Sequence, residues 1–197
     1  MVEGGALKLI TTNDTRYEFC NIKTTNLLPS VLASTAADSK GCDEAIFIRD
    51  GKITECSHSN IFIAKGNKLI THPSSKWILS GIIRGFVIKN AAEIGVSVNE
   101  KAFTIEDLYA ADEIFITSTT KLISEATSVN GITVGGKNPA LVKKLKSYLF
   151  ESYNRREKQI LEVLNKYGIS SIEECAEICK AKGFDPYKIT EGIQPIC

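Results

Sequence analysis

Short runs of alternating apolar and polar residues predict strands along the first three quarters of the chain. Residues 16–20, for example, alternate between aromatic and other side chains. Two pairs of such runs flank Asp50-Gly51 and Gly66-Asn67, which are typical turn sequences of β-hairpins. The predicted strands are residues 7–10, 16–20, 44–49, 52–55, 60–64, 68–71, 96–99 and 111–117, with a last pair within 122–134.

Apolar residues at helical spacing predict helices between these strands. One helix is predicted over residues 29–40 and ends before Gly41, and a second follows from residue 82 and ends before Gly95. A short helix begins at Thr104. A longer one begins at Asn138-Pro139, where an N-cap residue precedes a proline. Strands joined both by hairpins and by helices predict a mixed α/β fold.

The composition changes near residue 150. From Glu151 onward the chain is highly charged, and residues 171–174 have the Ser-x-x-Glu form of a capping box for a separate short helix. We therefore predict a main domain over residues 1–149 and a charged helical extension of different origin over 150–197. Within the extension, residues 183–187 and 192–196 resemble the start of an unrelated bacterial protein family, so a fused reading frame would explain the change.

The overall charge narrows the classes of function. The 24 lysines and arginines nearly balance the 23 aspartates and glutamates, so no charge excess points to nucleic acid or to a membrane surface. No apolar run approaches the ~18 residues of a membrane span. The N-terminus also lacks the layout of a signal peptide. We expect a cytoplasmic protein that binds neither nucleic acid nor membrane.

The cysteines and histidines form no pattern typical of a metal site. The six cysteines contain no CxxC pair, and His58 and His72 are far from zinc-site spacing. Cys175 and Cys179 are four residues apart and would share one face of a helix, where ordinary packing is much more common than metal or redox chemistry. We predict no metal.

Three segments carry residues that could together form a cofactor site. Lys23 ends a predicted strand, Glu55 lies between two strands among hydroxyl residues, and Gly81 begins a helix. A nucleophilic lysine must meet an aldehyde carbon, a pyridine cofactor needs an acid opposite its ring nitrogen, and a phosphate needs the N–H groups of a helix N-terminus. Taken singly, each is more often structural: a solvated lysine, a turn glutamate and a plain helix cap.

In combination these segments resemble the class IV (fold-type IV) pyridoxal-phosphate-dependent aminotransferases. The matching segments are residues 23–28, 54–60, 79–82 and 117–120, and the resemblance extends over residues 7–149. The segment Asn-Ile-Lys-Thr-Thr-Asn-Leu-Leu, residues 21–28, is most similar to the D-amino acid (D-alanine) aminotransferases. Branched-chain aminotransferases and aminodeoxychorismate lyases are less similar.

The resemblance implies the large domain of that family, a mixed sheet or pseudo-barrel with packed helices, and transamination between a D-amino acid and a 2-keto acid. Lys23 would form the Schiff base with pyridoxal 5'-phosphate and then move the substrate proton. Glu55 would pair with the ring nitrogen, and Leu79 would pack against the ring. The other cofactor-binding residues that the resemblance implies are Ser57, His58, Ser59, Asn60, Gly81, Ile82, Ile83, Ser118 and Thr119.

Some features depart from the family pattern. Ile83 replaces a threonine that gives many relatives a hydroxyl donor, and His58 replaces a small or hydroxyl residue. Relatives carry a small N-terminal domain before the lysine segment, and we expect it to be missing here. Three interpretations stay open: an active transaminase whose small domain another chain supplies; a cofactor-binding remnant without turnover; and a structural or interaction module with an idle lysine. Relatives act as homodimers, which implies a homodimer here too. The sequence does not fix the amino donor, its stereochemistry or the keto acid.

Overall fold

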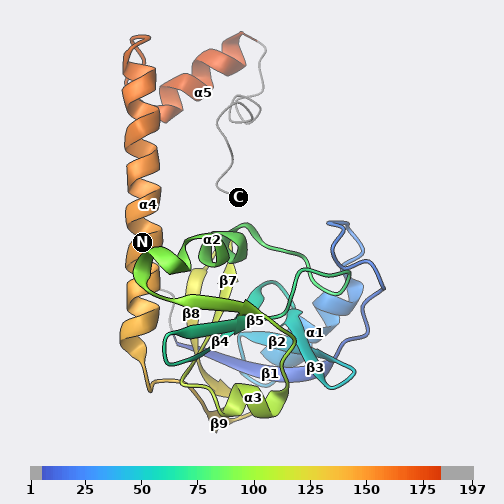
Figure 1. Cartoon of the computed structure of the whole chain (residues 1–197). Coiled ribbons are helices and arrows are strands. Elements are labelled where there is room, and N and C mark those ends of the chain that lie inside the picture. Colours follow the sequence, from blue (N-terminus) through green and yellow to red (C-terminus); the bar gives the residue numbers. More distant parts are fainter. Residues whose placement is uncertain (1–5, 183–197) are drawn as a thin grey trace. The chain divides into compact units, whose positions relative to one another are not determined.

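The computed structural model describes residues 6–182 and divides into two compact units, Met1–Lys146 and Ser147–Cys197. In the first unit, strands curl around an apolar core with helices beside them (Figure 1). The strands are β1 (Leu7–Asn13), β2 (Glu44–Arg49), β3 (Lys52–Cys56), β4 (Asn60–Lys65), β5 (Lys68–Thr71), β6 (Ser97–Glu100), β7 (Glu113–Ser118), β8 (Leu122–Val129) and β9 (Ile132–Thr133).

The strands of the first unit form a single mixed sheet. Their order is β3-β2-β1-β8-β7-β4-β5-β6, and β9 pairs with β8 outside this order. The pairs β1–β2, β1–β8 and β5–β6 are parallel, and the remaining pairs are antiparallel. The predicted hairpins around Asp50-Gly51 and Gly66-Asn67 join β2 to β3 and β4 to β5.

The two ends of this strand order meet, so the sheet curls into a partly closed barrel. Ile53 of the end strand β3 forms an antiparallel bridge with Phe103, which lies just after the other end strand, β6. Its N–H donates to the Phe103 carbonyl at 2.9 Å. The enclosed core takes residues from both ends of the order: Leu7, Leu9, Ile46, Ile53, Cys56, Ile61, Ile63, Phe103, Leu108, Ala111, Ile114, Ile116, Ala126, Val129 and Val134.

Three helices and a 3-10 helix lie beside this sheet (Figure 1). α1 (Leu28–Asp38) packs Ala33 and Ala37 against β1 and β2. α2 (Ile82–Asn90) packs against β7 and is followed by the 3-10 helix η1 (Ala91–Ile94). α3 (Ile105–Tyr109) begins with a capping box between Thr104 and Asp107, as the prediction of a helix at Thr104 required.

The long helix α4 (Pro139–Asn165) begins in the first unit and ends in the second. It therefore runs through the predicted boundary between residues 149 and 150, and the division of the chain by origin stays a prediction. In the second unit, Ser171 caps α5 (Ile172–Ala181) by accepting the Glu174 N–H at 3.0 Å. No helix within residues 6–182 is long and apolar enough to cross a membrane. Residues 183–187 and 192–196 lie outside the described part.

Two predicted elements are wrong. Residues 16–20 form a loop, because β1 and its partner β2 end at Asn13 and Arg49 and leave no strand to pair with. In this loop Phe19 is 54% exposed while Cys20 is buried, so the alternation does not mark an apolar face toward the core. The helix predicted from residue 82 to Gly95 is also not continuous, since α2 ends at Asn90 and η1 follows.

Candidate active site

A cavity of about 310 Å³ lies where β3, β4 and β7 meet the loop after β1. In β4 and β7, Asn60 is the register partner of Thr117, so the start of one strand lies beside the end of the other. The cavity brings together these predicted site residues: Lys23, Glu55, Ser57, His58, Ser59, Asn60, Leu79, Gly81 and Ser118. Of the other predicted residues, Ile82, Ile83 and Thr119 do not line it.

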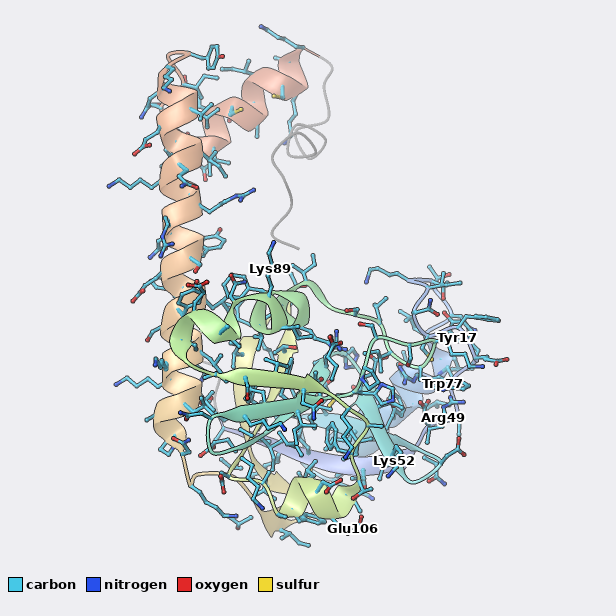
Figure 2. The ribbon with its side chains drawn as sticks, viewed as in Figure 1. Tyr17, Arg49, Lys52, Trp77, Lys89 and Glu106 are labelled. Carbon is cyan, nitrogen blue, oxygen red and sulfur yellow. The ribbon has the colours of Figure 1, made fainter. Side chains whose placement is uncertain are left out.

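Lys23 lies in an exposed loop rather than at the end of a strand, and Tyr17 braces this loop. The Tyr17 hydroxyl donates to the Ile22 carbonyl at 2.9 Å and lies 3.2 Å from the Thr24 hydroxyl, so it contacts the residues on both sides of Lys23. Tyr17 lies at the same end of the first unit as Trp77 and Arg49 (Figure 2). Sequence reasoning had not singled out Tyr17, because it was assigned to a strand.

Glu55 is a buried carboxylate that receives three donors. Arg16 Nη1 donates to Oε1, Asn60 Nδ2 donates to Oε2 at 2.9 Å, and the Leu79 N–H is shared between both oxygens at 3.1 and 3.0 Å. Burial raises the pKa of Glu55 to about 7, against the charge and hydrogen bonds of Arg16 and the Leu79 N–H, which lower it. Near neutral pH this side chain can therefore hold or release a proton.

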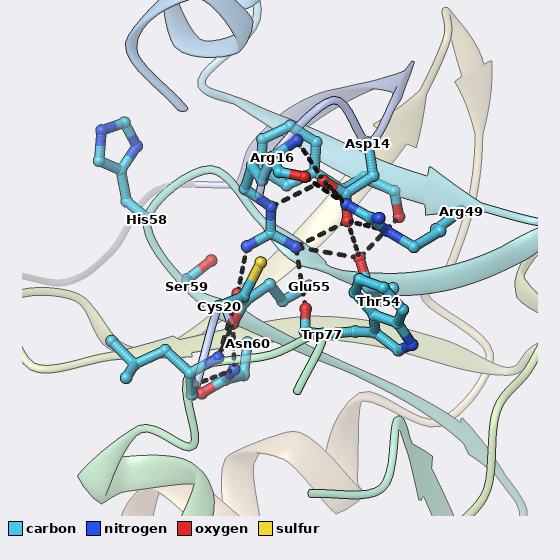
Figure 3. Close-up of polar contacts among 12 residues, drawn as sticks. Asp14, Arg16, Cys20, Arg49, Thr54, Glu55, His58, Ser59, Asn60 and Trp77 are labelled. Carbon is cyan, nitrogen blue, oxygen red and sulfur yellow. Dashed lines mark hydrogen bonds and ion pairs between the residues drawn. The ribbon is translucent and has the colours of Figure 1, made fainter. Parts of the chain in front are cut away.

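Arg16 belongs to a buried charged network behind Glu55 (Figure 3). Its Nε and Nη2 each donate to one oxygen of Asp14 at 2.9 Å, and its guanidinium stacks on Phe47 with 4.3 Å to the ring centroid. Arg49 contacts the same aspartate at 3.2 Å. This network was missed, since Arg16 reaches Glu55 across 39 residues of sequence, and only the Asp-x-Arg spacing after a strand could have hinted at it.

Asn60 connects Glu55 to the turn before α2. Its Nδ2 donates both to Glu55 and to the Leu79 carbonyl, each at 2.9 Å, and its Oδ1 accepts the Gly81 N–H at 2.9 Å. A Cβ at position 81 would lie only 2.6 Å from this Oδ1. A glycine is therefore required where the chain passes Asn60.

The N-terminus of α2 opens near the cavity, with Gly81 as its N-cap. The first turn of a helix leaves backbone N–H groups without partners inside the helix, and such a terminus attracts anions. Ile82 is exposed and Ile83 half-buried at this end. Nearby, Thr117 and Ser118 line the cavity, and the Thr117 hydroxyl is buried without a hydrogen-bond partner among the described residues.

Glu44 fixes the loop of residues 57–59 from behind. This buried carboxylate accepts the His58 N–H at 2.6 Å and the Ser59 hydroxyl at 2.9 Å, and burial raises its pKa while these two donors and the nearby charges lower it. The His58 side chain is 60% exposed, and its Nδ1 lies 3.2 Å from the Ser57 hydroxyl. Glu44 was also missed, as nothing near it in the sequence suggests a site.

The amino-transferase class IV family model matches residues 5–129, and a model described as GGGtGRT protein matches residues 150–197. The D-alanine aminotransferase of Bacillus licheniformis is 43% identical over 135 residues, which make up 68% of this chain and 48% of that protein. A putative branched-chain-amino-acid aminotransferase of Methanocaldococcus jannaschii is 37% identical over 155 residues, or 78% and 50% of the two chains. The chain thus spans about half the length of the curated relatives it matches.

Solved structures show the same likeness. A putative 4-amino-4-deoxychorismate lyase from Legionella pneumophila has a TM-score of 0.71 and 26% identity, over 77% of this chain and 57% of that one. The branched-chain amino acid aminotransferase from Thermobaculum terrenum in its PLP form has a TM-score of 0.67 and 28% identity, over 78% and 53%. The predicted fold, a mixed α/β domain of the fold-type IV aminotransferases, is confirmed. The chain belongs to the class IV aminotransferase family.

Proposed function

We propose that this chain binds pyridoxal 5'-phosphate through Lys23 and serves transamination between a D-amino acid and a 2-keto acid. The observation that carries the proposal is that Lys23, Glu55 and the N-terminus of α2 meet at one cavity. The D-alanine aminotransferases among the relatives, at 41–43% identity, support the D-amino acid as donor. A solved relative in its PLP form supports the cofactor.

The residues at the cavity suit this cofactor. Glu55 lines the cavity, and its three donors from the protein hold the carboxylate where a protonated ring nitrogen would meet it. The Thr117 hydroxyl is buried and unpartnered among the described residues, and it offers a polar contact to a ligand. Gly81, the N-cap of α2, lines the same cavity, so the N-terminus of this helix lies beside it.

We assign a role to each predicted site residue, including Ile82, Ile83 and Thr119, which do not line the cavity. Lys23 would hold the cofactor covalently, Glu55 would meet its ring nitrogen, and Leu79 would pack on its ring. The phosphate would lie at the amides of Ile82 and Ile83. The groups that would complete or orient the site are Ser57, His58, Ser59, Asn60, Gly81, Ser118 and Thr119.

When bound, pyridoxal phosphate supplies an electron sink for the bond electrons of a substrate α-carbon. The protein's own part is proton transfer and control of charge. The Lys23 amine would take the proton from the α-carbon and return it one step later, as general base and then general acid. Glu55 would keep the ring nitrogen protonated. Asn60, Arg16 and the Leu79 N–H hold the Glu55 carboxylate in position for that role.

Apolar side chains beside the cavity support a second copy of the chain as partner. The loop after β1 and the first turns of α1 expose large apolar side chains between residues 19 and 32. Such patches are typical of protein interfaces. A homodimer in the cytoplasm is accordingly part of the proposal, and the sedimentation coefficient of the purified chain checks the dimer. The exposed residues are Phe19, Ile22, Leu27, Leu28, Val31 and Leu32.

Reductive trapping tests the proposal. The chain is incubated with pyridoxal phosphate, reduced with borohydride and mapped by peptide mass spectrometry. The label is expected on Lys23 and absent in Lys23→Ala, whereas Lys76→Ala, which removes an exposed lysine outside the cavity, should keep it. Undiminished labelling in Lys23→Ala would contradict the proposal.

Adding D-alanine before the reduction separates turnover from binding. Loss of the trapped label and of the visible absorbance band after D-alanine addition indicates transamination. A label that D-alanine leaves unchanged supports the alternative of a cofactor-binding remnant without turnover.

A further inference from the structure

Asp14 is a fully buried carboxylate next to the site, and the proposed reaction gives it no role. Its side chain is 0% exposed, and it receives a bidentate pair of hydrogen bonds from Arg16 at 2.9 Å. Arg49 and the Thr54 hydroxyl also donate to it, at 3.2 and 3.3 Å. The pKa of Asp14, which burial alone would raise, is lowered by these arginines to about 2. Asp14 is therefore ionised at neutral pH.

Arg16 is held from several sides, and only one of its donors reaches Glu55. Asp14 occupies Nε and Nη2, the Trp77 carbonyl accepts from Nη2 at 3.0 Å, and Phe47 covers the face of the guanidinium. The remaining nitrogen, Nη1, donates to Glu55. Because a guanidinium is planar, fixing one edge fixes the direction of the other.

We propose that Asp14 is a positioning residue that acts on Glu55 through Arg16: it fixes the edge of the guanidinium that faces Glu55, and it offsets part of the charge that Arg16 brings to that carboxylate. The inference rests on the proposed function, in which Glu55 meets the ring nitrogen of the cofactor. It extends that function to a residue that touches neither Glu55 nor the cavity.

The charges in the network balance in pairs. When all four groups are ionised, Asp14 and Glu55 each carry a negative charge and Arg16 and Arg49 each carry a positive charge. The four together then have no net charge. Removing the Asp14 charge leaves an excess positive charge beside Glu55, which then holds its proton less tightly. Removing the Arg49 charge leaves Asp14 less compensated, so Glu55 holds its proton more tightly.

Other titratable groups also face Glu55 and stay the same in this comparison. Burial raises the pKa of Cys20 and that of Cys56, so both thiols are neutral near pH 7. Besides Arg16, the remaining titratable groups that line the cavity with Glu55 are Tyr17, Lys23 and His58.

The test is the titration of the Glu55 carboxyl carbon by NMR in the chain without cofactor, with the signal assigned from its loss in Glu55→Gln. In Asp14→Asn we expect the Glu55 pKa to fall by about one unit, a tenfold increase in its acid dissociation constant. In Arg49→Gln we expect it to rise. Asp38→Asn, which removes an exposed carboxylate on α1, is the control and should leave the titration unchanged.

The direction of the two shifts decides the outcome. A merely structural role for the network would loosen the site in both variants and move the Glu55 titration the same way, and that result would overturn the inference. An unchanged titration in Asp14→Asn would overturn it too. Where Asp14→Asn does not fold, Arg49→Gln decides alone: a rise supports the inference, and a fall or no change rejects it.

This experiment is independent of the proposed function. The titration needs no cofactor, so opposite shifts without trapping on Lys23 would retain the role of Asp14 toward Glu55 and reject the cofactor. Trapping on Lys23 together with Glu55 pKa shifts in the same direction in both variants would support the cofactor and reject the role of Asp14.

Discussion

Gly81 occupies a position where even a methyl group does not fit, and Gly81→Ala tests how tightly the site is packed. The added Cβ would lie 2.6 Å from Asn60 Oδ1, which is far below van der Waals contact. Asn60 cannot withdraw freely, because its Nδ2 is bonded to Glu55 and to the Leu79 carbonyl. The backbone at Gly81 is extended, with φ −72° and ψ 152°, so alanine meets no strain of its own. The clash is the sole cost.

The magnitude follows from the hydrogen bonds that Asn60 would lose. A neutral bond contributes about 0.5–1.5 kcal/mol and a bond to a charged group about 1.5–3 kcal/mol. Overpacking by one methyl group costs about 1–3 kcal/mol. Against this, the change from glycine to alanine stabilises by about 0.4–1 kcal/mol through the unfolded chain. We expect Gly81→Ala to lower the free energy of unfolding by about 2 kcal/mol.

Gly85→Ala is the matched control, because it makes the same change in the same helix where space is open. Gly85 lies inside α2, and a Cβ there would meet no atom within 4 Å. Replacing a helical glycine with alanine should raise the free energy of unfolding by about 0.5–1 kcal/mol. Urea denaturation followed by fluorescence measures both variants, and Trp77 is the single tryptophan of the chain and lies close to the site.

A double-mutant cycle with Asn60→Ala decides whether the clash is the cause. Without the Asn60 side chain, Gly81→Ala should stabilise by about 0.4–1 kcal/mol, so the coupling free energy should be about 2.5–3 kcal/mol. The reasoning is refuted if Gly81→Ala destabilises the Asn60→Ala variant as much as it destabilises the wild type. A Gly81→Ala variant as stable as Gly85→Ala would refute it as well.

Two other changes test the site. Burial raises the pKa of Glu55 to about 7, so its stabilising contribution is fully present below about pH 4.5 and is lost as the pH rises through 7. The free energy of unfolding of Glu55→Gln, minus that of the wild type, should therefore rise by about 2–3 kcal/mol from pH 4.5 to pH 8, as measured by urea denaturation. A difference that does not change with pH would contradict the raised pKa of Glu55. Ile83→Thr should bind pyridoxal phosphate about threefold to tenfold more tightly by Trp77 fluorescence, because the hydroxyl can donate to phosphate. Ile83→Val, which lacks the hydroxyl, should not.

Much of the fold could be predicted, because its signals are local. Asp50 and Gly51 both have positive φ, 49° and 73°, as the turn type of a tight hairpin requires. Asn130 and Gly131 repeat this at the turn between β8 and β9, with φ of 52° and 78°. The sequence of the turn itself determines these angles, so no knowledge of distant residues was needed.

The errors arise where a distant partner decides the structure. Residues 16–20 have the alternation of a strand, but a strand also needs a neighbour, and β2 has already ended at that level. The end of α4 was not predicted, for a different reason. Its second half lacks a simple apolar face, yet residues 155–164 are rich in Arg, Glu, Lys and Leu, which favour helix without a partner.

The residues of the candidate site also fall into two groups, those that local sequence predicts and those that depend on distant contacts. The lysine, glutamate and glycine segments could each be found from local chemistry. Arg16 and Glu44 could not, because their roles come from contacts with residues between 14 and 61 positions away. Asp14 is only two residues from Arg16, but its role depends on the distant contact between Arg16 and Glu55. A charged residue that is buried by a distant segment looks like any surface residue in the sequence.

Asn60 explains why the separately predicted segments form one site. It follows Glu55 by only five residues, yet its side chain also binds the backbone on both sides of Ser80, at Leu79 and Gly81. The Glu55 carboxylate accepts the Leu79 N–H as well, so one side chain of β3 and one of β4 hold the turn that begins α2. Because β4 also pairs with β7, the same residue sets the distance from Glu55 to the Thr117 end of that strand. A change at Asn60 should therefore disturb the carboxylate and the helix terminus together, whereas a change at Lys23, on its exposed loop, should leave both in place.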